Sequence, residues 1–126
     1  MNTEIDRKIA VIFATDVVGY SKHMEADESE TIRNLRACEK ILTGLFEKHI
    51  GRVFNTGGDS FLAEFPSAVS AVECAVEFQK AIKERNSSEE ASVKLQFRIG
   101  INSGDVIKEK DTFLVTVLIL QQGSKH

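Results

Sequence analysis

The feature that most constrains the fold of this chain is a pair of apolar, strand-like runs, each followed by an aspartate. Residues 12–21 read IFATDVVGYS and residues 53–65 read VFNTGGDSFLAEF, which sets Asp16 and Asp59 beside these runs. A charge next to a buried strand is costly unless a partner compensates it, and a divalent cation does so directly. Either aspartate alone would indicate only a turn residue. Two of them on neighbouring strands suit a two-metal phosphoryl-transfer site.

Composition sets limits on the class of protein. A chain of 126 residues predicts a single domain, and 42% hydrophobic with 28% charged residues is ordinary for a soluble globular chain. A net charge of −3 argues against a nucleic-acid-binding surface. Because no apolar run is long enough to span a membrane and the N-terminus is polar, we expect a cytoplasmic protein without a membrane segment. Cys38 and Cys74 lie in helix-like patterns and are predicted to be reduced core thiols.

Hydrophobic periodicity predicts the order β-α-β-β-α-β-β. Alternating or continuous apolar runs indicate strands, and apolar residues at three- and four-residue steps indicate helices. The predicted fold is an α+β sandwich of the ferredoxin-like kind, incomplete at its C-terminal end, with the helices on one face of the sheet. The predicted elements are strand 8–13, helix 27–50 (N-capped by Asp27 and stopped by Gly51), strands 52–55 and 60–65, helix 67–85, strand 93–101, turn 102–104 and strand 105–109.

The turn after the first strand is a candidate phosphate site. Gly19 would let backbone N–H groups approach a phosphate, and Tyr20 and Ser21 would begin a helix whose N-terminus favours anions. A plain strand-to-helix turn explains the same residues, and Gly19 alone does not decide between these alternatives.

Four ordered stretches carry a resemblance to a known family. They are residues 13–21 (FATDVVGYS), 51–65 (GRVFNTGGDSFLAEF), 71–79 (AVECAVEFQ) and 97–106 (FRIGINSGDV). In this order and spacing the chain resembles the catalytic domain of the class III nucleotidyl cyclases, the adenylate and guanylate cyclases, over roughly residues 8–110. Four ordered blocks are far more specific than a single motif.

The resemblance implies an enzyme of cyclic-nucleotide signalling, a lyase that converts ATP or GTP to the 3′,5′-cyclic nucleotide and pyrophosphate. Two divalent ions, Mg²⁺ or Mn²⁺, would be bound by Asp16, Asp59 and the backbone carbonyl of Val17. The family's site forms between two catalytic domains, so a homodimer is implied. The residues assigned to nucleotide binding are Val18, Gly19, Tyr20, Asn55 and Gly58.

Two departures from the family pattern bear on function. Asn55 stands where adenylate cyclases often have Lys and guanylate cyclases Glu, which leaves the purine open, with ATP expected first. After Glu109 the family presents a segment of the type DxxGxxVNxAAR, whose Asn and Arg act on the ribose and on the transition-state charge. Here the sequence reads DTFLVTVLILQQGSKH from Asp111, with no Asn after Asn102 and no Arg after Arg98.

We hypothesise that a one-base deletion produced this tail. When one A is restored after the codon for Asp111, a reverse translation of the tail reads DNFLGDGVNIAARLEA, which is the missing family segment. Residues 111–126 are therefore predicted to be out of frame, and the chain to have little or no cyclase activity.

The alternatives are a natural divergent tail with a strand over 113–120, and a nucleotide-binding or dimerisation remnant without catalysis. A further alternative is a diguanylate cyclase-like enzyme, because residues 57–61 (GGDSF) resemble the GGDEF signature of that family, with Ser60 in place of its acidic residue.

Overall fold

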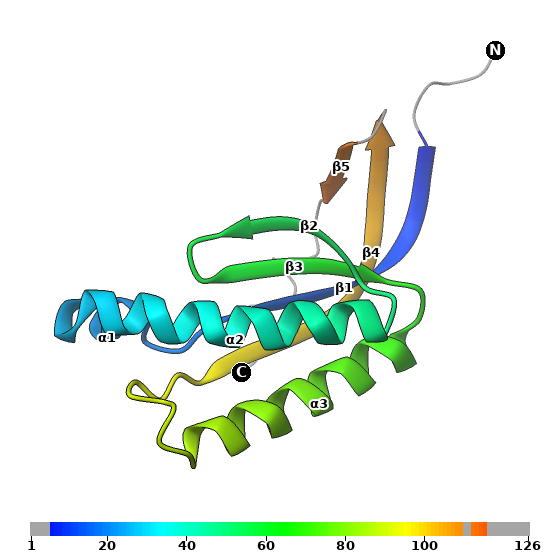
Figure 1. The fold of residues 1–126 in the computed structure, drawn as a ribbon. Coiled ribbons are helices and arrows are strands. Elements are labelled where there is room, and N and C mark those ends of the chain that lie inside the picture. Colours follow the sequence, from blue (N-terminus) through cyan, green and yellow to red (C-terminus); the bar gives the residue numbers. More distant parts are fainter. Residues whose placement is uncertain (1–5, 110–111, 116–126) are drawn as a thin grey trace.

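The structure, a computed structural model, describes residues 6–109 and 112–115. The elements follow the order β-α-α-β-β-α-β-β (Figure 1). The helix expected to begin at Tyr20 and Ser21 is a short element of its own, and the strand predicted over 105–109 is part of the strand before it. The elements are β1 (Asp6–Val17), α1 (Tyr20–Ala26), α2 (Glu28–Lys48), β2 (Arg52–Gly57), β3 (Ser60–Phe65), α3 (Ala68–Asn86), β4 (Phe97–Glu109) and β5 (Thr112–Val115).

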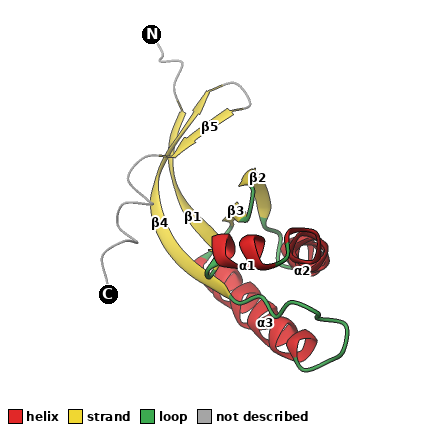
Figure 2. Cartoon of the chain, turned by 90° about the vertical axis from the view of Figure 1, so that its left-hand side faces the viewer, coloured by secondary structure: helices red, strands yellow, loops and turns green. Residues whose placement is uncertain are grey.

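The sheet has the strand order β2-β3-β1-β4-β5, and all neighbouring strands are antiparallel. The connection from β1 through α2 to β2 leaves a space that β3 fills, and α3 then crosses back so that β4 pairs with the other side of β1. The helices lie on one face of the sheet, while β5 and the adjoining ends of β1 and β4 extend beyond them (Figure 2). This arrangement confirms the predicted α+β fold of the ferredoxin-like kind.

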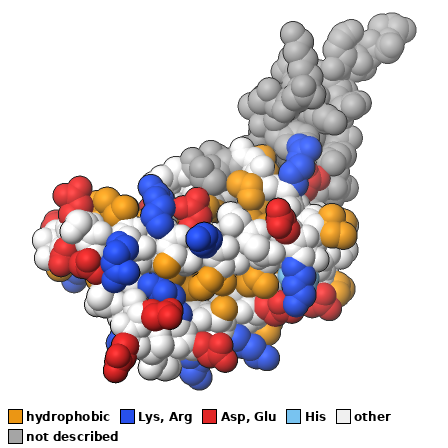
Figure 3. Space-filling model, viewed as in Figure 1, with side chains coloured by type: hydrophobic (Ala, Val, Ile, Leu, Met, Phe, Trp, Pro, Cys, Tyr) orange, Lys and Arg blue, Asp and Glu red, His pale blue; other side chains and the backbone are white. Residues whose placement is uncertain are grey.

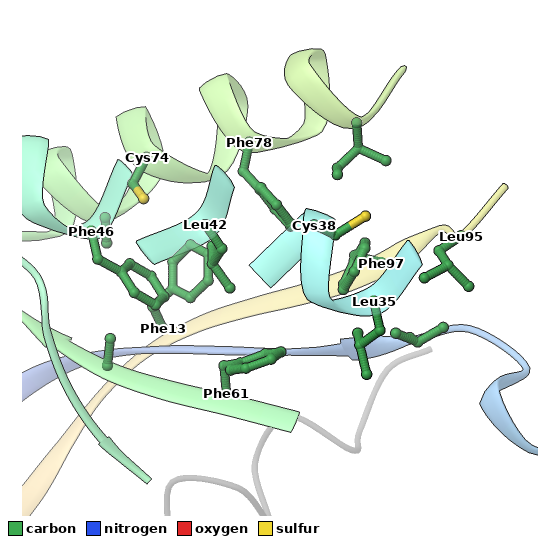
Figure 4. Packing of buried hydrophobic residues seen from close by; sticks show 14 of the residues in the cluster. Phe13, Leu35, Cys38, Leu42, Phe46, Phe61, Cys74, Phe78, Leu95 and Phe97 are labelled. Atoms are coloured by element: carbon green, nitrogen blue, oxygen red, sulfur yellow. The ribbon is translucent and has the colours of Figure 1, made fainter. Parts of the chain in front are cut away.

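The core between the sheet and the two long helices is rich in aromatic rings (Figure 4). Phe13 on β1 is fully buried and lies 5.3 Å from the ring of Phe46 on α2 and 5.6 Å from that of Phe65 on β3. The Phe13–Phe46 contact is edge-to-face, an arrangement that adds to the hydrophobic gain of burying the rings. Cys38 and Cys74 are free thiols buried in the same cluster, as predicted.

The ends of α2 follow the sequence signals in part. Asp27 caps the N-terminus by accepting a hydrogen bond from the Glu30 N–H, as predicted. At the C-terminus, Gly51 does not take the left-handed conformation that usually stops a helix. Ile50 does, with φ 64°, and the Gly51 N–H then bonds the Phe46 carbonyl. Gly51 is needed for space instead, because a Cβ there would come within 2.6 Å of the Phe65 ring.

Two predicted strand boundaries are wrong. β1 continues to Val17, so Asp16 lies within the strand and not in the turn that follows it. β4 begins at Phe97 and not at residue 93, because the alternation over 93–96 reflects burial of Leu95 in the core without strand pairing.

The predicted turn at 102–104 is also absent, since β4 runs through it to Glu109 with Asn102 opposite Ile12 of β1. The long partner strand supplies backbone hydrogen bonds throughout, and these override the local Asn-Ser-Gly signal. The hairpin partner of β4 is β5, which overlaps the alternative strand over 113–120 at residues 113–115. The rest of that run lies outside the described residues.

The surface over α2 and α3 carries both signs of charge. Lys and Arg side chains alternate with Asp and Glu across this face (Figure 3). Of the helices in the described part of the chain, none has both the length and the hydrophobicity needed to cross a membrane.

Candidate functional site

Asp16 lies near the end of β1, directly opposite Arg98 of β4. Residues opposite each other in an antiparallel pair project from the same face of the sheet, which brings the two side chains together. The neighbouring Thr15 hydroxyl donates a 2.6 Å hydrogen bond to the backbone carbonyl of Arg98. The end of β1 is therefore fixed against β4 by both its backbone and its side chains.

Asp59 reaches the same strand end from the other side. It occupies the two-residue turn between β2 and β3, where Gly58 adopts a left-handed φ of 58°. The Val17 N–H donates a 3.1 Å hydrogen bond to Oδ2 of Asp59. The turn therefore holds the Asp59 carboxylate against the residue that follows Asp16.

Arg98 forms a bidentate ion pair with Asp16. Its Nε is 3.0 Å from Oδ1 and its Nη2 is 3.1 Å from Oδ2, so both carboxylate oxygens of Asp16 accept a hydrogen bond. The pair is accessible to solvent, with 69% of the Arg98 side chain and 38% of the Asp16 side chain exposed. Asp16, and to a smaller extent Asp59, raise the pKa of Arg98. Two carboxylates and one guanidinium therefore share this end of the sheet.

Sequence reasoning missed Arg98 as a member of the site. It occupies the polar side of an alternating strand pattern, which ordinarily indicates a solvent-facing position. Only the register that sets Arg98 opposite Asp16 identifies it, and this register depends on the pairing of strands far apart in the sequence.

The predicted phosphate-binding turn lies directly before α1, and Gly19 is the N-cap residue of that helix. Gly19 has φ 66° and ψ 34°, and α1 has no side-chain cap. The Val18 N–H, which the resemblance assigned to the nucleotide, already donates to the Gln96 carbonyl at 2.8 Å. The Tyr20 side chain packs against the core, which leaves its backbone as the part that could contact an anion. Among the predicted N–H donors, those of Gly19 and Tyr20 suit the role best, because N–H groups at the start of a helix have no acceptor within it.

The remaining nucleotide-binding candidates lie on the β2–β3 hairpin. Asn55 is on β2 opposite Leu62 of β3, and its side chain lies outside the described part of the structure. Gly58 is exposed, and a Cβ placed there would meet nothing within 4 Å. Gly58 thus leaves open space beside Asp59.

The donors at this strand end suit a hard divalent cation. Asp16 and Asp59 offer carboxylate oxygens. Val17, which follows Asp16 and donates its N–H to Asp59, offers a backbone carbonyl. Among the described residues, no group of three or more Asp, Glu, His or Cys side chains is placed so that it could hold a metal ion. Mg²⁺ does not require such a cage, since it is commonly bound by one or two carboxylates together with water and substrate phosphates. The residues present therefore fit Mg²⁺ or Mn²⁺, and they do not fit a thiolate- or imidazole-bound metal.

Comparison with known proteins gives a consistent result. The family profile of the adenylate and guanylate cyclase catalytic domain matches residues 1–113. A putative adenylate cyclase 3 of Rhizobium meliloti is 42% identical over 111 residues, which are 86% of this chain and 19% of that protein. The chain thus spans about a fifth of the length of this relative.

Solved structures agree with this match. An adenylate/guanylate cyclase/hydrolase from Silicibacter pomeroyi is 31% identical, with a TM-score of 0.76 over 87% of this chain and 64% of that chain. The guanylyl cyclase Cya2 has the same fold, with a TM-score of 0.77 and 23% identity over 95% of this chain and 69% of that chain. Since the family profile extends from β1 through both aspartates and all of β4, this chain belongs to the adenylate and guanylate cyclase catalytic domain family.

Proposed function

We propose that this domain converts ATP, or alternatively GTP, to its 3′,5′-cyclic monophosphate and pyrophosphate, using two divalent ions bound at Asp16 and Asp59. The observation that carries the proposal is the hydrogen bond from the Val17 N–H to Oδ2 of Asp59. It ties the β2–β3 turn to the end of β1, so that two carboxylates from distant parts of the chain serve one site. The family match supports this chemistry over that of a diguanylate cyclase.

The residues of the chain would divide the work as follows. Asp16, Asp59 and the Val17 carbonyl would bind the ions with oxygen ligands of the kind that Mg²⁺ and Mn²⁺ prefer. When bound, such ions lower the pKa of the ribose 3′-hydroxyl and neutralise charge on the phosphates. The N–H groups of Gly19 and Tyr20 would orient the triphosphate at the start of α1.

The choice of purine and the assembly state are part of the same proposal. Asn55 offers an amide that can donate to or accept from a purine edge, which does not separate ATP from GTP. ATP is the first expectation, in keeping with the name of the Rhizobium meliloti relative. A homodimer would complete the site, with its two copies in contact through the catalytic domain.

The tail decides whether the printed sequence is active. The family profile ends at residue 113, two residues beyond Asp111, where the reading frame is proposed to shift. The Asn and Arg that the family places after this point are missing from the sequence. Because removing one electrostatic contact to a transition state costs about 10²–10³ in rate, we infer that the 126-residue polypeptide has little or no activity. It would then act as a nucleotide-binding or dimerisation remnant.

The test compares the 126-residue chain with a protein expressed from a gene in which the frame is restored after Asp111. We expect the restored protein to form cyclic nucleotide from ATP or GTP in the presence of Mn²⁺, and the 126-residue chain to form none. Asp59→Asn should lower the restored rate by about a hundredfold or more. Glu89→Gln, which removes a charge from an exposed loop, is the matched control and should not change it. Full activity of Asp59→Asn would overturn the metal assignment, and activity of the 126-residue chain would overturn its inferred inactivity. The frame shift itself would be overturned by a gene sequence with an uninterrupted frame and no cyclase-like continuation out of frame.

A further inference from the structure

The two aspartates of the site are held by different partners. Oδ2 of Asp59 accepts from a neutral backbone N–H, that of Val17. Both oxygens of Asp16 accept from the cationic guanidinium of Arg98. A divalent ion bound through Oδ1 of Asp59 can therefore leave this hydrogen bond in place, whereas an ion bound by Asp16 meets oxygens that both already accept from a cation.

From this asymmetry we propose that Arg98 is a built-in competitor of the divalent ion for Asp16, which lowers the metal affinity of the nucleotide-free domain. The inference rests on the proposed function, because it assumes that Asp16 is a metal ligand. It adds that an ion at Asp16 competes with the positively charged Arg98 guanidinium for the carboxylate oxygens.

The geometry determines both the strength and the reversibility of this competition. The bidentate contact uses both carboxylate oxygens, and guanidinium and carboxylate match each other well in this arrangement. Arg98 is also 69% exposed, so its side chain can move into solvent without unpacking the core. Exposed ion pairs are weak, and the competition is expected to reduce affinity only severalfold. When no ion is bound, the same contact neutralises Asp16 and fixes its orientation.

A metal-binding experiment tests this without catalysis. Binding of Mn²⁺ alone to the 126-residue chain would be measured by electron paramagnetic resonance of the free ion. We expect Arg98→Ala to bind Mn²⁺ about two- to fivefold more tightly than the wild type, which is the equilibrium equivalent of one exposed ion pair. Arg98→Lys keeps the charge without the bidentate fork and should fall between the two. Arg36→Ala breaks a similar exposed pair on α2, with Glu39, and should match the wild type.

The outcomes separate this inference from the proposed function. Equal or weaker Mn²⁺ binding by Arg98→Ala overturns the competition, as does an Arg98→Lys variant that matches the wild type while Arg98→Ala binds more tightly. In the second case the effect of Arg98 is that of its charge at a distance. Loss of Mn²⁺ binding in Asp16→Asn and Asp59→Asn would support the proposed metal site, whichever result the Arg98 variants give. If neither aspartate variant weakens binding, the metal site itself is refuted, and the inference fails with it. Circular dichroism melts would confirm that each variant folds.

Discussion

The core beneath the helices and the site at the end of β1 are stabilised in different ways. In the core, Phe13, Phe46 and Phe65 meet ring against ring with almost no exposure to solvent. At the site, the Asp16–Arg98 pair is substantially exposed and depends on two hydrogen bonds. Packing therefore determines the fold, while a small number of polar contacts holds the candidate site together.

The glycines of the two regions show the same difference. Gly51 borders the core, and any Cβ there would overlap the Phe65 ring. Gly19 and Gly58 border the site, where a Cβ would meet nothing within 4 Å, yet both have a left-handed φ. The core thus requires glycine for its small size and the site requires it for its backbone conformation. Substitutions at these positions separate steric from conformational costs.

The largest expected effect is on the core. Phe13→Ala should lower the free energy of unfolding by about 3–5 kcal/mol, because it removes a fully buried ring and leaves a cavity between β1, α2 and β3. Urea unfolding followed by circular dichroism measures this change. The control at the site is Val18→Ala, whose side chain is 39% exposed and whose loss should cost about 0.5 kcal/mol or less. Similar losses for the two variants would contradict the difference between core and site.

Gly51→Ala should have the next largest effect. Its Cβ would come within 2.6–3.0 Å of three atoms of the Phe65 ring, which is itself packed against Phe13 and Phe46. Overpacking of this kind costs about 1–3 kcal/mol, measured by the same unfolding experiment.

Gly44→Ala is the matched control for this substitution. Gly44 is exposed on α2, with nothing within 4 Å of an added Cβ, so alanine should stabilise the helix there by about 0.5–1 kcal/mol. A Gly51→Ala variant as stable as the wild type would mean that the Phe65 ring moves aside without cost.

Gly58→Ala tests the site by a conformational route. The left-handed φ of 58° should cost alanine about 1–2 kcal/mol, although its Cβ meets no atom within 4 Å. Gly58→Asn should cost less, since asparagine tolerates this conformation better. The turn also carries Asp59, so the amide resonance of Val17, which donates to Asp59, should shift in Gly58→Ala. Equal losses for Ala and Asn would point to a steric cause instead.

Much of the fold could be predicted from the sequence because its signals are local and repeated. The apolar stripes of α2 and α3, the Asp27 cap and the turn at Gly58 and Asp59 each depend on a few neighbouring residues. The strand boundaries around residues 16 and 102–104 could not, because they depend on backbone pairing between β1 and β4. A turn signal such as Asn102-Ser103-Gly104 is overridden when a long partner strand lies beside it.

The candidate site was predictable only as far as its motifs extend. Asp16 and Asp59 stand out as charges beside apolar runs, and the structure brings the turn of one against the strand end of the other. Arg98 carries no such signal, because an arginine in an alternating strand is indistinguishable in sequence from any solvent-facing residue. The Val18 N–H illustrates the reverse case. Its position in the motif suggested a phosphate donor, whereas the backbone of Gln96 already accepts its hydrogen bond.

The smallest expected effect concerns the end of α2, where a conformational cost lies next to the core. Ile50 adopts φ 64° although it is β-branched, and it is 73% exposed, so little burial is lost when its side chain is removed. Ile50→Gly should relieve about 1–2 kcal/mol of left-handed strain and incur about 0.5–1 kcal/mol of additional chain entropy. The net result should be a gain of about 0–1.5 kcal/mol in the free energy of unfolding. Ile50→Ala keeps a Cβ and should gain little, and an equal gain for both would assign the effect to the exposed side chain. Together with Gly51→Ala, the two Ile50 variants would separate the conformational cost from the packing cost in the free energy of unfolding, at two adjacent residues of the same helix end.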